Sequence, residues 1–241
     1  MNKKILNQIA NQMVADSKGI LAIDESHGTC KKRFDALNIE VTEENRRSYR
    51  DMLVTASSLT KYISGAILFD ETIKQSTSQG ISFPDYLDKI GIIPGIKVDA
   101  GAKPFPCHPN EKITEGLDDL PRRMEEYKSL GAKFAKWRAV ITIGDSIPSN
   151  ACMIANSHAL ARYASICQEV DIVPIVEPEV LMDGTHDIQK CFDVTNATQS
   201  ILFETLDKLN VDLSGIILKP NMITSGASCE KKSSSEEIAE L

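Results

Sequence analysis

Few signatures of extracellular, metal-binding or nucleotide-binding proteins occur in this chain of 241 residues. Its six cysteines form no CxxC pair and no ladder of close spacings, which argues against a disulfide framework and a structural zinc site. Neither a GxGxxG turn nor a GxxxxGK[ST] loop is present. The four histidines are scattered over expected helix and loop positions, so we expect reduced thiols, no metal site and no cofactor.

The chain also lacks long hydrophobic runs and an excess of positive charge. Ile5, Ile9 and Val14 have helical spacing near the N-terminus, but polar residues interrupt them too often for a signal peptide or a membrane span. A net charge of −7 argues against a nucleic-acid partner, although local basic clusters could hold a small phosphorylated substrate. We therefore expect a cytoplasmic protein that binds neither nucleic acid nor membrane.

What the sequence does contain is an alternation of short apolar strands and longer helices. We expect strands at residues 19–23, 65–69, 92–98, 135–141, 172–176 and 215–218. Helices are expected at the N-terminus, at 42–59, 84–90, 117–130, 148–170 and 187–209, and from about 233, with the longest loop at 101–116. This alternation predicts an α/β fold whose parallel strands are joined by helices.

Charged residues appear at the end of every expected strand, and their distribution indicates the kind of sheet. An open dinucleotide-binding sheet concentrates its site at one switch point, whereas a barrel places active residues at the carboxyl ends of many strands. The distribution favours a TIM barrel, formed by a single domain over residues 1–241. The strand ends are marked by Asp24, Asp70, Lys97, Lys136, Glu177 and Lys219.

Lys219 is the candidate around which the chemistry is organised. It follows the apolar run 215–218, which we expect to be buried on both faces, and precedes Pro220. A partly desolvated lysine at this end of a barrel strand can act as an amine nucleophile toward a carbonyl. The alternative is a structural lysine whose charged end extends to solvent.

A nearby cation would make such an amine more reactive. Lowering a lysine pKa from about 10.4 to roughly 8 increases the neutral fraction at pH 7 by about 250-fold. We expect Lys136 to supply that charge, with burial as a second contribution. Glu177, Glu179 and Asp24 could then transfer protons.

Each of these residues also has a structural interpretation. For Glu177 and Glu179, the structural alternative is a salt bridge to Lys136 or Lys219 without a role in catalysis. For Asp24, the alternative is a role as the N-cap of the next helix and nothing more, and for Lys97 it is a solvated strand end.

Eight segments together resemble class I fructose-1,6-bisphosphate aldolase over nearly the whole chain. They are LAIDESHGT, TEENRRSYR, GAILFDET, GIKVD, FAKWRAVITIG, ARYASICQ, IVPIVEPEVL and ILKPNM. The resemblance implies a (β/α)₈ barrel, usually a homotetramer, that acts in glycolysis and gluconeogenesis. It cleaves fructose 1,6-bisphosphate reversibly to dihydroxyacetone phosphate and glyceraldehyde 3-phosphate through a lysine Schiff base.

The resemblance also implies roles for individual residues. Lys219 matches the Schiff-base lysine, and Glu177 matches the general acid and base of imine formation, with Glu179 near the amine. Lys136 matches the lysine that supports the carbinolamine, and Asp24 the aspartate that handles the substrate C4 hydroxyl.

Further residues resemble the family's phosphate site. Candidates for the C6 phosphate and the basic mouth around it are Ser26, Thr29, Lys97 and Arg138, with Lys32 and Arg33 as weaker ones. Ala100 departs from the family pattern, because many relatives carry a basic residue there.

The largest departure is in the number of strands. The family has eight strand–helix units, whereas six are counted here, and the Ser-Gly-Gly and Gly-Arg loops that bind the C1 phosphate in relatives are not seen. The sequence therefore looks like an aldolase truncated at its C-terminal end. We keep two alternatives: a catalytically silent aldolase fragment with a binding or scaffold role, and a different Schiff-base aldolase.

Overall fold

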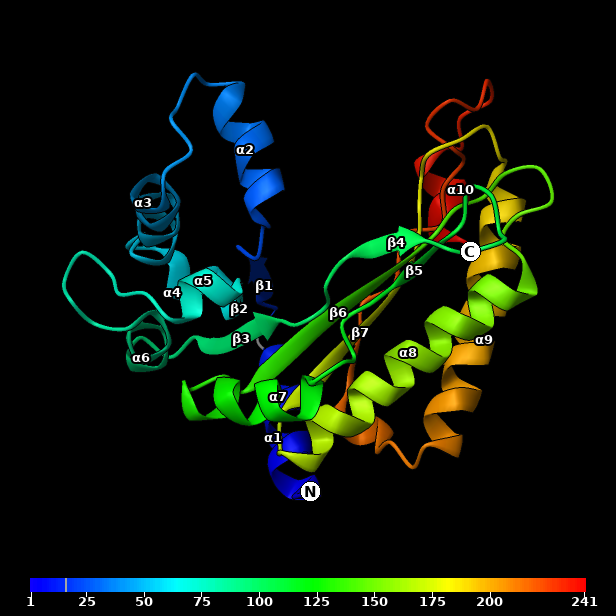
Figure 1. Ribbon diagram of the computed structural model, residues 1–241. Coiled ribbons are helices and arrows are strands. Elements are labelled where there is room, and N and C mark those ends of the chain that lie inside the picture. The colour runs from blue at the N-terminus through cyan, green and yellow to red at the C-terminus, as the bar shows by residue number, and fades with distance from the viewer. Residues whose placement is uncertain (16) are drawn as a thin grey trace. The chain divides into compact units, whose positions relative to one another are not determined.

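The computed structural model describes residues 1–15 and 17–241, and within them six strands form one sheet. Their order is β1 (Gly19–Ala22), β2 (Ile63–Leu68), β3 (Ile93–Lys97), β6 (Phe134–Ile141), β7 (Val173–Val180) and β8 (Ile217–Leu218) (Figure 1). The pairs β1–β2, β2–β3, β3–β6 and β7–β8 are parallel, as the strand–helix alternation predicted.

The chain divides into two compact units. The first comprises Met1–Val98, Pro121–Lys136 and Cys167–Val173, and the second comprises Asp99–Leu120, Trp137–Ile166 and Pro174–Leu241. Strands β6 and β7 each begin in the first unit and end in the second. A single barrel domain over residues 1–241 stays a prediction.

The first unit is built on buried strands. In β2, five of the six residues are buried, as expected for a parallel strand covered on both faces. Gly95 in β3 lies against the ring of Phe134, where an added Cβ would stand 2.3 Å from ring carbons, so this position requires glycine. Its helices are α1 (Lys3–Met13), α2 (His27–Asp35), α3 (Glu43–Val54), α4 (Leu59–Tyr62), α5 (Asp70–Ile73), α6 (Phe83–Lys89) and nearly all of α7 (Leu120–Ser129).

The second unit packs two long helices beside its strands. Figure 1 shows α8 (Asn150–Glu169) running alongside β6 and β7, and α9 (Ile188–Lys208) next to α8. Trp137 of β6 stacks on Tyr163 of α8 with ring centroids 5.5 Å apart, so one face of β6 is covered by this helix. The remaining elements are η1 (Leu213–Gly215), α10 (Ser235–Ala239) and an antiparallel pair of β4 (Ala102–Pro104) and β5 (Lys112–Thr114).

Two predicted helix starts are confirmed by their caps. The Thr42 side chain accepts a hydrogen bond from the backbone N–H of Asn45, and α3 begins at the next residue. Ser234 forms a capping box with Glu237 at the start of α10. These starts were predictable because a cap uses only neighbouring residues.

Three local predictions are wrong. Residues 101–116 contain the β4–β5 pair instead of forming only a loop. Strand β7 continues through Glu177 and Glu179 to Val180 instead of ending before them. The strand before Lys219 has only two residues, both partly buried, because residues 213–215 form a 3₁₀ turn.

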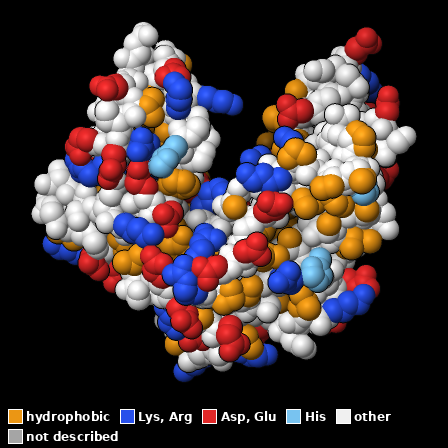
Figure 2. Space-filling view, viewed as in Figure 1, with side chains coloured by type: hydrophobic (Ala, Val, Ile, Leu, Met, Phe, Trp, Pro, Cys, Tyr) orange, Lys and Arg blue, Asp and Glu red, His pale blue; other side chains and the backbone are white. Residues whose placement is uncertain are grey.

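Two general properties of the chain concern its surface and its helices. Figure 2 shows Lys and Arg side chains interspersed with Asp and Glu side chains over the visible face. No helix in the described part of the chain is both long enough and apolar enough to cross a membrane.

Candidate active site

Asp24 and Lys136 form a buried ion pair in the first unit. Asp24 follows β1, and its carboxylate accepts a hydrogen bond from Lys136 Nζ on β6 at 3.0 Å. The two side chains are only 9% and 10% exposed, so each charge relies on the other to offset its lost hydration. The alternative that Asp24 merely caps the next helix is wrong, because Ser26 is the N-cap of α2.

Lys97 lies beside this pair in the sheet. Its Cα is paired in register with that of Lys136, so the carboxyl end of β3 lies beside the early part of β6. Lys136 is the third residue of β6, so the prediction that it marks a strand end is wrong. Lys97 is partly buried, which differs from the fully solvated strand end considered as an alternative. The first unit therefore places Lys136 next to a second cation and in contact with one carboxylate.

The four candidates for a phosphate site near the start of the chain lie in or next to α2. The Ser26 hydroxyl oxygen accepts a hydrogen bond from the backbone N–H of Thr29 at 3.4 Å, and the hydroxyl oxygens of the two residues lie 3.3 Å apart. Both residues are exposed, as are Lys32 and Arg33 in the last turn of the helix. Arg33 is paired with Glu25, which makes it a weaker phosphate ligand than an unpaired arginine would be.

The second unit contains an ion pair between Lys219 and Glu177. The Lys219 ammonium donates to Glu177 Oε1, joining the end of β8 to β7. Glu177 is 3% exposed, whereas the Lys219 side chain is 49% exposed, so the carboxylate is buried and the amine is only partly desolvated. The reason is the short β8, whose two residues are themselves only partly buried.

Arg138 and Glu179 form a separate ion pair in the same unit. Glu179 thus pairs with an arginine, whereas the sequence suggested Lys136 or Lys219 as its partner. On β6, Trp137 packs against α8, and strand periodicity places Lys136 and Arg138 on the opposite face of the strand. Among the described residues, no group of three or more His, Cys, Asp or Glu is arranged to hold a metal ion.

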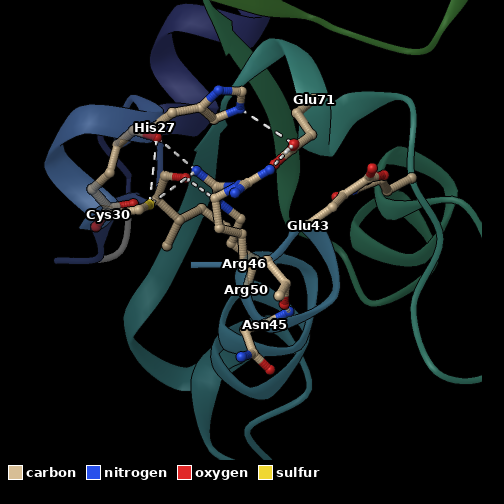
Figure 3. A network of polar contacts seen from close by, with 11 residues as sticks. His27, Cys30, Glu43, Asn45, Arg46, Arg50 and Glu71 are labelled. Carbon is tan, nitrogen blue, oxygen red and sulfur yellow. Dashed lines mark hydrogen bonds and ion pairs between the residues drawn. The ribbon is translucent and has the colours of Figure 1, made fainter. Parts of the chain in front are cut away.

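A polar network in the first unit was missed by the sequence reasoning (Figure 3). Glu71, at the start of α5, receives two hydrogen bonds from Arg46 of α3, at 2.9 and 2.6 Å, and lies 3.5 Å from Arg50 of the same helix. His27 contacts the same carboxylate at 3.2 Å. The available signal was that Arg50 lies one helical turn before the buried Val54, on the inward face of α3.

This network makes a prediction about stability and pH. Hydrogen bonds from Arg46 hold the pKa of Glu71 below its ordinary value of 4.5, although partial burial opposes them. We expect Glu71→Gln to lower the free energy of unfolding at pH 7 by about 3 kcal/mol, because the arginines lose a largely buried carboxylate. The stabilisation is complete above pH 4.5 and is lost as pH falls through the lower folded-state pKa.

Urea unfolding at pH 7 and near pH 3 measures this difference. The difference in the free energy of unfolding between the wild-type protein and Glu71→Gln is expected to be smaller at the lower pH. Glu44→Gln is the matched control, because Glu44 pairs with Arg47 on the exposed side of α3, where solvent screens the interaction. If this difference in the free energy of unfolding were the same at both pH values, the Glu71 charge would not be the source of the stabilisation.

Comparisons with known proteins agree on one family. The family model for class-I fructose-bisphosphate aldolase matches residues 5–241. The chain is similar to a probable fructose-bisphosphate aldolase class 1 of Xanthomonas axonopodis pv. citri, with 58% identity over 240 residues that cover 100% of this chain and 72% of the relative. Fructose-bisphosphate aldolase 1 of Toxoplasma gondii is 50% identical over 98% of this chain and 66% of that relative.

A solved structure gives the same result for the fold. The fructose-bisphosphate aldolase of Plasmodium falciparum, solved in a ternary complex with TRAP and a small-molecule inhibitor, matches with a TM-score of 0.95 and 47% identity. The match covers 98% of this chain and 69% of that one. It confirms the predicted fold class, since the described sheet supplies six strands of a (β/α)₈ barrel.

Proposed function

The chain belongs to the class I fructose-bisphosphate aldolase family, and we propose that Lys219 is the lysine through which it carries out the family's reaction. That reaction is the reversible aldol cleavage of fructose 1,6-bisphosphate to dihydroxyacetone phosphate and glyceraldehyde 3-phosphate through a Schiff base, in glycolysis and gluconeogenesis. The observation that carries the assignment is the hydrogen bond between Lys219 and the buried carboxylate of Glu177.

This pair has the two groups that imine formation needs. Transfer of a proton from the Lys219 ammonium to Glu177 leaves a neutral amine, which attacks the C2 carbonyl of the ketose. Glu177 then returns a proton to the carbinolamine hydroxyl, and water leaves as the iminium forms. Glu177 is well placed for this exchange, because its oxygen is already within hydrogen-bond reach of the amine.

Asp24 and Lys136 are proposed to act on the substrate. Asp24 accepts the proton of the C4 hydroxyl as the C3–C4 bond breaks, and the bonding electrons move into the iminium to give an enamine. Lys136 supports the carbinolamine, and its hydrogen bond to the Asp24 carboxylate holds that carboxylate in place for the proton transfer. Protonation of the enamine at C3 and hydrolysis of the imine then release dihydroxyacetone phosphate and restore Lys219.

The remaining candidates are assigned to substrate binding. We propose that Ser26, Thr29 and Lys97 bind the C6 phosphate, because hydroxyl groups and an ammonium are suitable donors to a phosphate dianion. Arg138 adds positive charge at the basic mouth, while Glu179 holds the arginine by its ion pair. Lys32 and Arg33 remain weaker candidates.

The cellular setting is also part of the proposal. We propose a homotetramer in the cytoplasm, as the resemblance to the family implied.

The catalytically silent fragment is the less favoured alternative, because the residues matched to the family's chemistry are all present. A cleavage assay distinguishes the two.

Cleavage of fructose 1,6-bisphosphate by the protein, as it is naturally produced, is expected to be unaffected by EDTA. The proposed electron sink is the Lys219 iminium, so the reaction needs no Lewis acid. The measurement follows formation of both triose phosphates before and after prolonged dialysis against the chelator. Activity that disappears in EDTA and returns with zinc would contradict the Schiff-base assignment. Absence of cleavage by a folded protein would favour the silent alternative.

A further inference from the structure

Arg50 is a fully buried arginine that the proposed mechanism leaves unused. Its side chain is 0% exposed, and it lies on the inward face of α3. Burying a guanidinium is costly unless its donors are satisfied and its charge is paired. The partners of Arg50 therefore indicate what this residue does.

Two of these partners flank Asp24 in the sequence. Arg50 Nε donates to the backbone carbonyl of Ile23 at 3.2 Å, and Arg50 Nη2 donates to that of Glu25 at 2.6 Å. The two carbonyls belong to the residues immediately before and after Asp24. One rigid guanidinium thus holds the backbone on both sides of the proposed catalytic carboxylate.

The other side of the guanidinium is anchored to acidic and aromatic groups. Arg50 Nη1 lies 3.5 Å from Glu71 Oε1, and the guanidinium carbon lies 5.7 Å from the centre of the Phe69 ring. Arg46 binds the same carboxylate through two hydrogen bonds, so Glu71 is itself held in place (Figure 3). The orientation of Arg50 is therefore fixed independently of Asp24.

We propose that Arg50 is a positioning residue for Asp24. Lys136 contacts the Asp24 carboxylate at 3.0 Å, whereas Arg50 fixes the main chain from which that side chain extends. A lysine at position 50 would keep the charge but could not reproduce the planar arrangement of donors toward both carbonyls. This inference rests on the proposed function, because it gives Asp24 its task at the C4 hydroxyl.

Arg50→Lys is expected to lower kcat for cleavage of fructose 1,6-bisphosphate by about 10- to 100-fold, since a displacement of about 1 Å at a catalytic group can cost that much. Trapping of dihydroxyacetone phosphate at Lys219 by borohydride is expected to be unchanged. That ligand has only three carbons and so does not need the group that acts at C4. A general loss of structure would instead lower cleavage and trapping together, and that result would overturn the proposal.

A double-mutant cycle with Asp24→Ala separates positioning from an independent effect. If Arg50 acts through Asp24, adding Arg50→Lys to Asp24→Ala changes kcat by less than about twofold, because coupled residues are not additive. If instead the double variant loses kcat by the product of the two single losses, Arg50 does not act through Asp24, and the proposed function is unaffected. Failure of the wild-type protein to trap dihydroxyacetone phosphate at Lys219 would overturn the proposed function itself.

Two further variants complete the experiment. Arg47→Lys is the matched control, since Arg47 lies on the same helix, is partly exposed, and pairs with Glu44; it should leave cleavage unchanged. If Arg50→Lys does not fold, Glu71→Gln replaces it in the cycle, because it removes the anchor of Arg50 while keeping the guanidinium. Glu71→Gln is expected to lower kcat for cleavage less than Arg50→Lys would, and to leave trapping unchanged. Combined with Asp24→Ala, it should lower kcat no further. Losses in kcat that multiply would again overturn the proposal.

Discussion

Lys219→Met is expected to reduce kcat for cleavage by about 10⁴-fold or more, because it removes the nucleophile on which the covalent route depends. The same variant should give no borohydride-dependent adduct with dihydroxyacetone phosphate. Methionine has a similar length and no amine, and the half-exposed position of Lys219 tolerates the change without creating a core cavity. The effect on stability is therefore expected to be small compared with the effect on activity.

Peptide mass mapping of the wild-type adduct provides the direct measurement. The mass increase should lie on the peptide that contains Lys219. Lys208→Met is a suitable control, since Lys208 is an exposed lysine at the end of α9 that pairs with Glu204. An adduct on another lysine, or substantial cleavage by Lys219→Met, would show that the nucleophile has been assigned to the wrong residue.

Glu177→Gln is expected to lower kcat by about 10²- to 10⁴-fold, which is the range for loss of a general acid–base group. Glutamine has nearly the same shape and its amide oxygen can still accept a hydrogen bond from Lys219, but it cannot exchange a proton at neutral pH. Imine formation should then become slow. Borohydride trapping at short incubation times should therefore fall, while trapping at long times recovers.

A separate carboxylate provides the control for this substitution. Glu204→Gln changes an exposed side chain that pairs with Lys208, and it should leave both the cleavage rate and the trapping rate unchanged. If Glu177→Gln retained a kcat within about threefold of wild type, the ion pair with Lys219 would be structural and not catalytic.

The buried pair of Asp24 and Lys136 illustrates why partners are harder to predict than candidates. Both residues were predicted as candidates from their positions in or next to expected strands, but they are 112 residues apart in the sequence. Glu179 shows the same limit, because the sequence suggested Lys136 or Lys219 as its partner and the structure pairs it with Arg138. Strand periodicity indicates which face a side chain occupies, but the neighbour across the face depends on strand order and register.

Strand ends also depended on tertiary pairing. The sequence predicted a strand that ends at residue 176, yet β7 continues through Pro178 to Val180. The backbone pairing of β8 stops near Lys219, whose N–H donates to Val176, and beyond it the Val180 N–H donates to the side chain of Asn221. Pro178 therefore lies where this neighbour no longer pairs through its backbone, so its missing N–H is tolerated.

The sequence by itself determined the strand–helix alternation, the caps at Thr42 and Ser234, the family and the candidate residues. These depend on local periodicity, on hydrogen bonds between near neighbours, and on motifs that are read in order along the chain. Only the tertiary structure decided that Lys219 is half exposed against a buried Glu177, and that Arg50 bridges the carbonyls on either side of Asp24. The physical reason is that exposure and long-range hydrogen bonds depend on which segments pack together, and residue spacing along the chain does not specify that.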